Sequence, residues 1–258
     1  MKRFFKVIGF FLVGVILLAL LAYLVFFIKW KLESSSNLAL LGEEAPTLTL
    51  DGYQFRDLNK NGKLDVYEDS RAHIKNRIDD LLGQMNIEEK AGMMFVHFLP
   101  MEEDGSLLEI PTFLDPFSFM TESTSSTILK KKMNHVQNLG GTSALNYAKW
   151  NNNLQKFAEK TRLGIPITLI SDPRHGNTGM AGASVETRWI STWPSQLGLG
   201  AIGDSALIRD FADIARQEYL AIGIRLAQHP MADLATEPRW ARVNGTFGED
   251  AALSAKLT

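Results

Sequence analysis

Six residues between positions 57 and 68 carry oxygen atoms at the spacing that a hard cation requires. They are Asp57, Asn59, Asn61, Lys63 through its backbone carbonyl, Asp65 and Glu68. This spacing, with Gly62 at the sharp turn, matches the EF-hand calcium loop. Asn, Asp and Gly also favour turns without any metal, so a turn that caps the following helix is the alternative. Because a single loop is visible, we expect a structural calcium clip rather than a paired sensor.

Acidic and basic side chains also follow two apolar runs in the second half of the chain. The run 165–170 ends at Ser171 and Asp172, and the charged segment 233–242 follows the apolar stretch 222–227. In parallel α/β proteins the working groups lie where strands end, so both positions are candidates for substrate contacts. For a carboxylate in such a place, helix capping is the alternative role.

The elements that must position these residues alternate between helices and strands. Apolar residues spaced three or four apart predict helices over 69–85, with one buried face, and over 144–160 and 205–221. Short apolar runs predict strands near 93–98, 134–139, 165–170 and 222–227. This alternation predicts a parallel sheet, either open and doubly wound or closed as a (β/α) barrel. A glycine-rich phosphate loop is absent from the sequence, which argues against a nucleotide-dependent oxidoreductase.

The first 31 residues predict a membrane anchor. Residues 7–28 contain no charge and would span roughly 33 Å as a helix, enough to cross a bilayer. The apolar part of a cleaved signal peptide is shorter, so we expect an uncleaved transmembrane signal anchor over 1–31. Lys2, Arg3 and Lys6 favour a cytoplasmic amino terminus, which would leave the body periplasmic or extracellular. Residues 32–50, which include three consecutive serines, predict a linker.

Composition excludes several other classes of protein. The 258 residues are 45% hydrophobic, which is typical of a globular core rather than a disordered chain. The formal net charge is −2, and five basic residues but no acid precede position 32, so the body is acidic and nucleic acid is not an expected partner. The sequence contains no cysteine, which excludes a disulfide, a zinc–thiolate site, a thiol nucleophile and lipoprotein acylation.

Three sequence blocks occur in a characteristic order along the body. The first runs from Arg162-Leu163-Gly164-Ile165-Pro166 to Asp172 and His175-Gly176; the second joins Trp193-Pro194 to Gly198-Leu199-Gly200-Ala201; the third joins Glu237-Pro238-Arg239-Trp240-Ala241-Arg242 to Thr246-Phe247-Gly248-Glu249-Asp250. A weaker fourth block spans 84–90. Together the blocks resemble glycoside hydrolase family 3, the β-glucosidase and exo-glucanase family. The domain plan is then an anchor over 1–31, a linker over 32–50, a calcium loop over 51–69 and part of this family's amino-terminal domain over 70–258.

The resemblance implies an α/β fold, an incomplete (β/α)8 TIM-type barrel preceded by a transmembrane helix. It implies that Asp172 binds hydroxyls of the terminal sugar, because a carboxylate accepts two such bonds strongly and selectively. Arg242 would assist, with Arg239 as the alternative, and His175 would either line the pocket or pack its loop. No cofactor is required for the family's catalysis, so calcium would be structural.

The sequence also departs from the family. Ala241 and Gly245 stand where glycine and glutamate are common, and the family's Lys-His pair, aspartate nucleophile and glutamate acid/base are expected beyond Thr258. We therefore expect the amino-terminal part of a retaining, exo-acting β-glycosidase that hydrolyses O-glycosyl bonds of oligo- or polysaccharides, with this piece inactive alone. The alternative is a membrane-tethered, non-catalytic carbohydrate- or calcium-binding module.

Overall fold

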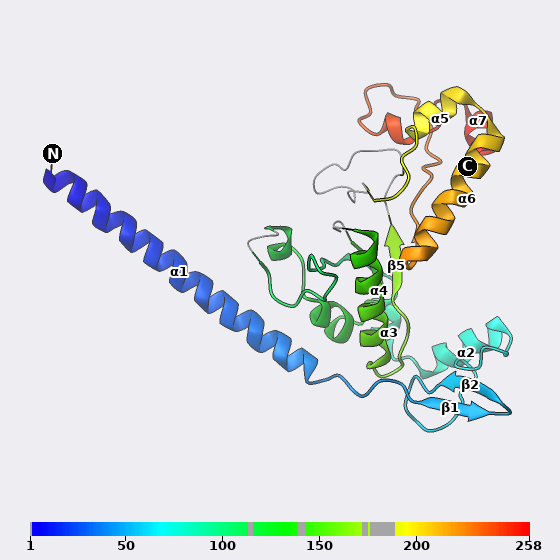
Figure 1. Ribbon diagram of the computed structural model, residues 1–258, viewed down its shortest axis with the longest axis horizontal. Helices are drawn as coiled ribbons and strands as arrows, with labels where there is room; N and C mark the ends of the chain where they lie inside the picture. The colour runs from blue at the N-terminus through cyan, green and yellow to red at the C-terminus, as the bar shows by residue number, and fades with distance from the viewer. Residues whose placement is uncertain (1, 113–115, 139–142, 172–174, 176–188) are drawn as a thin grey trace.

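The computed structural model describes residues 2–112, 116–138, 143–171, 175 and 189–258 (Figure 1). A long helix α1 (Lys2–Leu38) projects from a body that carries a small hairpin, a parallel sheet and its helices. The elements of the body before the sheet are β1 (Thr47–Leu50), β2 (Tyr53–Arg56), α2 (Ile74–Gln84) and α3 (Ile87–Gly92). The sheet region then contains β3 (Val96–Phe98), η1 (Pro116–Phe119), η2 (Ser126–Lys130), β4 (His135–Gln137), α4 (Ala144–Glu159), β5 (Thr168–Ser171), α5 (Gln196–Ile202), α6 (Ser205–Ile222), β6 (Ile224–Ala227), η3 (Val243–Gly245) and α7 (Ala251–Leu257).

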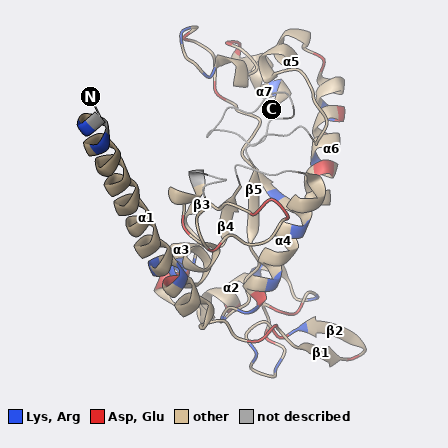
Figure 2. Cartoon of the chain, turned by 60° about the vertical axis from the view of Figure 1, so that its left-hand side comes forward, with Lys and Arg blue, Asp and Glu red and all other residues tan. Residues whose placement is uncertain are grey.

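Helix α1 has the length and composition of a membrane span. Among the described residues it is the helix that meets both criteria, with a mean hydropathy of 3.0 over its most apolar window. Basic side chains lie at both ends of α1 and none lies between (Figure 2). The helix continues through the serine run to Leu38, so the first part of the predicted linker is helical.

Four consecutive parallel strands form the sheet, in the order β3-β4-β5-β6. Val136, Leu169 and Ile224 are register partners on adjacent strands, and all three are buried in one apolar cluster. Helices α4 and α6 contribute Trp150, Leu154, Phe157, Tyr219 and Ile222 to the same cluster. Both helices therefore cover the same face of the sheet, and the predicted α/β class is confirmed.

Local capping explains where these helices begin and end. The Ser143 side chain accepts a hydrogen bond from Asn146 N at the start of α4, and Asp204 caps α6 in the same way. Gly223, with φ of 92°, ends α6 in the left-handed conformation that glycine adopts most readily. The bounds of both helices lie within one residue of the predicted ranges. Asn86 and Glu89 form a reciprocal capping box at the start of α3.

Helix α2 differs from its prediction. None of its residues is buried, and Ile74 and Ile78 are 60% and 49% exposed, so the expectation of a buried face is wrong for this helix. The helix contacts the preceding loop through polar side chains instead. Asp80 accepts a hydrogen bond from Tyr67 N at 2.9 Å, and Gln84 accepts one from Asn59 Nδ2 at 3.0 Å. The side of α2 that faces the body is therefore occupied by hydrogen bonds to the polar loop rather than by apolar packing.

Candidate active-site edge

The carboxyl ends of the parallel strands bring several polar residues to one edge of the sheet. Asn138 follows β4, Ser171 ends β5, and His229 lies two residues beyond β6. Asn138 and Ser171 are each 1% exposed, and the Asn138 amide donates to Leu99 O at 2.8 Å. Since working groups in parallel α/β folds collect at this edge, it is the candidate site.

His175 lies beside this edge and is fully buried. Its Nε2 is 2.8 Å from Glu218 Oε2 of α6, and the carboxylate also accepts hydrogen bonds from Ser191 N at 3.0 Å and Ser191 Oγ at 2.9 Å. Burial lowers the pKa of His175, and the nearby Glu218 charge opposes that shift. A neutral imidazole that donates from Nε2 fits this environment, so Glu218 ties two points of the connection between β5 and α5, His175 and Ser191, to α6.

Tyr219 makes a second contact between α6 and the edge. Its hydroxyl is hydrogen-bonded to His229 Nε2, and its ring lies 4.9 Å from the ring of His175. Sequence reasoning identified neither Glu218 nor His229. A signal for Glu218 is nonetheless present, because it is a charged residue between the buried positions Ala215 and Tyr219 of an amphipathic helix.

Arg239 and Arg242, the two other predicted substrate-binding residues that the structure describes, make no contact with His175. Asp172 lies outside the described residues. The Arg242 side chain is exposed, with Nη2 3.5 Å from Met231 Sδ. Arg239 pairs with Glu237 at 2.8 Å, its side chain is 89% exposed, and this pairing lowers the pKa of Glu237 to about 2. Arg239 therefore faces solvent in a local ion pair.

Packing connects the sequence blocks to one another. The Arg162 guanidinium forms an ion pair with Glu89 and donates to Gln84 O at 3.0 Å, which joins the first block to the fourth. A Cβ added to Gly200 would lie 2.2 Å from Phe247 O, so the second and third blocks meet where only glycine fits. One close glycine contact and one ion pair therefore join the four blocks in two pairs.

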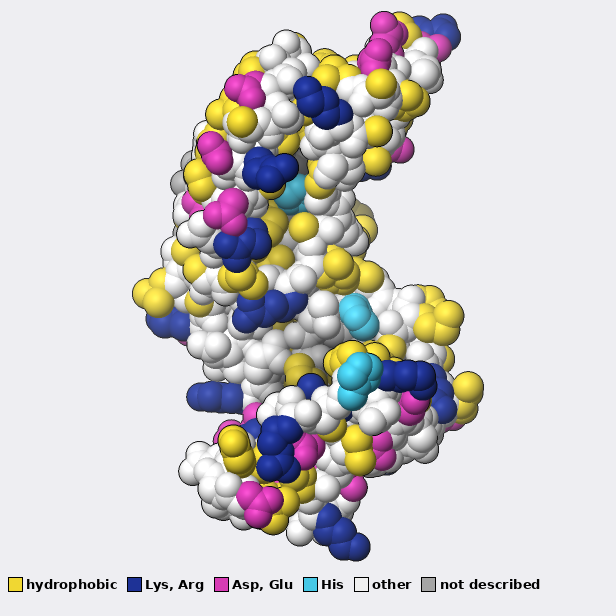
Figure 3. Space-filling view, turned by 90° about the vertical axis from the view of Figure 1, so that its right-hand side faces the viewer, with side chains coloured by type: hydrophobic (Ala, Val, Ile, Leu, Met, Phe, Trp, Pro, Cys, Tyr) yellow, Lys and Arg dark blue, Asp and Glu magenta, His cyan; other side chains and the backbone are white. Residues whose placement is uncertain are grey.

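A hollow of about 290 Å³ lies between α5, α6, β6 and α7. Ile208, Phe211, Leu226 and Phe247 are among its lining residues, and His175 and His229 also reach it. Figure 3 shows a hollow on this face of the molecule, bordered by hydrophobic, histidine and arginine side chains. Sugar sites require charged and polar partners for ring hydroxyls, so this mainly apolar hollow is a poor match for a pyranose.

The predicted calcium loop is closed by hydrogen bonds to two buried carboxylates. Asp57 accepts from Asn61 N at 3.0 Å and from Gly62 N at 2.8 Å, and Gly62 has φ of 77°. Glu68 accepts from Leu58 N at 2.7 Å and from Asp65 N at 3.0 Å. Within the described ranges no three His, Cys, Asp or Glu side chains converge as a metal group. The loop has the turn that calcium needs, and calcium binding stays a prediction.

Comparison with known proteins identifies the family. Residues 87–258 match the model described as the Glycosyl hydrolase family 3 N terminal domain. The chain belongs to glycoside hydrolase family 3. The chain is 45% identical over 214 residues to a periplasmic beta-glucosidase/beta-xylosidase of Dickeya chrysanthemi. The matched region covers 83% of this chain and 32% of the relative. It is 42% identical over 206 residues to beta-glucosidase C of Emericella nidulans, covering 78% of this chain and 31% of the relative.

This family 3 chain therefore spans about a third of the length of the curated relatives it matches. Its fold is also similar to a solved family 3 β-N-acetylglucosaminidase from Paenibacillus. That likeness has a TM-score of 0.50 at 18% identity and covers 67% of this chain and 29% of the solved one. At this identity the likeness concerns the fold alone.

Proposed function

We propose that this chain is the amino-terminal part of a retaining, exo-acting β-glycosidase anchored in a membrane. The observation that carries the proposal is the 45% identity to a beta-glucosidase/beta-xylosidase over most of this chain. The consecutive order of the parallel strands, with α4 and α6 on one face, supports the beginning of a (β/α)8 barrel.

In the proposed site Asp172 accepts hydrogen bonds from two hydroxyls of the terminal sugar, and Arg242 assists it. Asp172 directly follows Ser171, the last residue of β5, in the sequence, and this adjacency to the candidate edge supports the proposal. His175 and Glu218 support the site indirectly, because their hydrogen bond holds His175 against α6. Retaining hydrolysis also needs a nucleophile and an acid/base carboxyl about 5–5.5 Å apart. We assign neither role within this chain, and we propose that it binds sugar without hydrolysing it.

Helix α1 supports the second half of the proposal. Its uncharged residues 7–28 match the thickness of a bilayer core, and the three basic residues before them favour a cytoplasmic amino terminus. The body would then lie in the periplasm or outside the cell, where oligosaccharide substrates are accessible.

Saturation-transfer NMR of the 258-residue chain in detergent micelles tests sugar binding. Methyl β-glucoside and methyl β-xyloside are the probes, and we expect transfer to at least one of them. Asp172→Asn should abolish that transfer, whereas Asp213→Asn, a change of an exposed carboxylate on α6, should preserve it. Equal transfer in both variants would reject Asp172 as the sugar-binding carboxylate.

Hydrolysis of an aryl β-glucoside by the same preparation tests the inactivity of the piece. We expect no turnover above the uncatalysed rate. Turnover at enzyme-like rates would show that the chain already contains its nucleophile and acid/base.

A further inference from the structure

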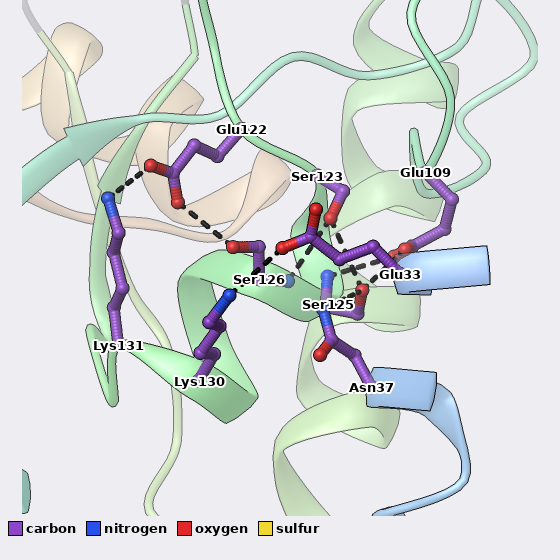
Figure 4. Close-up of polar contacts among 9 residues, drawn as sticks. All are labelled: Glu33, Asn37, Glu109, Glu122, Ser123, Ser125, Ser126, Lys130 and Lys131. Carbon is purple, nitrogen blue, oxygen red and sulfur yellow. Dashed lines mark hydrogen bonds and ion pairs between the residues drawn. The ribbon is translucent and has the colours of Figure 1, made fainter. Parts of the chain in front are cut away.

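The carboxyl-terminal part of α1, residues 30–38, is called its outer end here. It contacts the body through buried polar side chains (Figure 4). Ser34 Oγ donates to Glu109 Oε2 at 2.8 Å, and Asn37 Nδ2 lies 3.4 Å from Ser125 Oγ. Ser34 and Asn37 are each 7% exposed. Glu109 also accepts from Ser125 N at 2.9 Å, so one carboxylate joins α1 to the start of η2. Hydrogen bonds to a partly buried carboxylate are stronger than neutral ones, which favours a fixed joint.

Two further contacts lie nearer the apolar part of α1. Lys130 of η2 forms an ion pair with Glu33 at 3.0 Å, also drawn in Figure 4. The ring of Trp30 lies 5.7 Å from that of Phe119, edge to face. No break in the helix separates these contacts from the apolar span, because α1 is continuous from Lys2 to Leu38. The body is therefore joined directly to the membrane span, without a flexible segment between them.

The position of these contacts along α1 gives their depth. Ile28 is the last residue of the uncharged stretch, Trp30 lies about 3 Å beyond it along the helix axis, and Ser34 lies about 9 Å beyond it. The headgroup layer of a bilayer is about 5–7 Å thick on each side of the hydrocarbon core. With Ile28 at the edge of the hydrocarbon core, Trp30 lies within the headgroup layer, and Phe119, whose ring contacts Trp30, lies near that level.

The chemistry of the surface around this joint suits anionic lipid headgroups. Met120 is 82% exposed beside Phe119, an apolar side chain with no role in the core. Five lysines occur on α1 and at or just after the end of η2: Lys29, Lys31, Lys130, Lys131 and Lys132. Lys130 pairs with Glu33 and Lys131 with Glu122, so the attraction to anionic lipid rests on Lys29, Lys31 and Lys132. Lysines near an anionic membrane surface each contribute about 1 kcal/mol of attraction. Trp30 is also a typical interfacial residue, with an apolar ring and one polar N–H.

We propose that residues 119–132 and the outer end of α1 form one rigid surface that rests on anionic lipid headgroups. This inference relies on the proposed membrane anchor and adds that the body is docked at a fixed depth and orientation. The body would then stay close to the membrane surface rather than diffuse around the anchor on a flexible linker.

The absence of native cysteine allows a direct test by single-site spin labelling of the full chain in liposomes. A label at Met120→Cys should collide more with lipid-dissolved oxygen, and less with an aqueous nickel chelate, than one at Leu50→Cys. Leu50 is 47% exposed on the hairpin, which lies beyond the outer end of α1 (Figures 1 and 2). The difference should grow when anionic lipid replaces zwitterionic lipid. Equal accessibility at both sites would overturn the docked surface, and immersion that is independent of lipid charge would overturn its preference for anionic headgroups.

Disulfide formation tests the joint itself. Asn37→Cys with Ser125→Cys should oxidise readily in the inserted protein, whereas Leu32→Cys with Ser125→Cys should not, because Leu32 is 66% exposed on α1. Equal oxidation of both pairs would show a mobile α1 and refute the rigid joint. Alkaline carbonate extraction separates the two proposals: release of the chain refutes the anchor itself, whereas retention with equal labelling refutes only the docked surface.

Discussion

His175 and Glu218 are 43 residues apart in sequence, yet their side chains meet at 2.8 Å beneath the carboxyl edge of the sheet. The imidazole is completely buried, whereas the Glu218 side chain is 29% exposed. The partly solvent-exposed Glu218 carboxylate therefore accepts a hydrogen bond from the buried His175 Nε2. It also accepts two hydrogen bonds from Ser191.

Removing the Glu218 carboxylate should destabilise the protein. Glu218→Ala leaves the buried His175 Nε2 without its acceptor, which costs about 1–3 kcal/mol, whereas Glu218→Gln keeps an acceptor oxygen and should cost less. Urea unfolding of the full chain in micelles measures both. Asp213→Ala, on the exposed side of α6, is the control and should change stability far less. If Glu218→Ala unfolded at the same urea concentration as the control, the contact would have no stabilising role.

Stability should decline as the pH falls through the ordinary range of histidine. Burial lowers the pKa of both His175 and His97 in the folded protein, so the unfolded chain takes up protons first. The contribution of each neutral histidine to the free energy of unfolding is therefore complete above about pH 6.5, the pKa of histidine in the unfolded chain. This contribution is lost as the pH drops below that value. The lowered carboxyl pKa values of Glu89 and Asp69 act only at more acidic pH.

Urea midpoints at about pH 7.5 and about pH 5.5 bracket this histidine range and measure the loss. His175→Gln removes one titrating group and retains a donor for Glu218, so the difference between the two midpoints should shrink. An unchanged difference in this variant would mean that His175 does not titrate differently in the folded and unfolded states.

Local signals predicted some elements well and long-range contacts very little. Helices α4 and α6 match their predicted ranges because apolar spacing, the Ser143 cap and Gly223 all act within a few residues. The pairing of His175 with Glu218 joins distant segments that show no shared periodicity, so the sequence alone did not predict it.

The linker shows the same limit in another form. Three consecutive serines favour a flexible segment, yet Ser34 lies within α1, and its hydroxyl donates to Glu109, 75 residues away. Tertiary contacts override such weak local preferences. Helix α2 is the converse case, since a regular apolar pattern did predict a helix but not which face would meet the body.

Gly200 should not tolerate a side chain. The added Cβ of Gly200→Ala would lie 2.2 Å from Phe247 O, a backbone atom that cannot rotate away, and overpacking of this kind costs about 1–3 kcal/mol. Gly83→Ala is the matched control, because its Cβ would meet nothing within 4 Å on exposed α2 and should stabilise the helix by about 0.5–1 kcal/mol. Thermal unfolding of both variants decides. A Gly200→Ala protein as stable as the parent would show that α5 and the third block do not pack as described.

Calcium should stabilise the full chain through the loop at 57–68. The loop is attached to the body, since Lys60 Nζ donates to Thr161 O at 2.6 Å and Tyr67 Oη donates to Leu163 O at 3.2 Å, so ordering the loop also stabilises the first sequence block. Binding at a hundred times the dissociation constant adds about 2.7 kcal/mol. Melting curves with calcium up to roughly 10 mM cover the weak range, about 10⁻³ M, of extracellular calcium modules.

Glu68→Gln should remove most of the calcium-dependent rise in melting temperature, because a neutral amide is a poor bidentate ligand for Ca²⁺. Glu43→Gln changes an exposed carboxylate outside the loop and should retain the full rise. Magnesium should be less effective than calcium, since Mg²⁺ requires compact octahedral geometry that a flexible loop does not impose. A melting temperature unaffected by calcium in the parent protein would leave the turn as a capping structure alone, held by Asp57 and Glu68 without a metal.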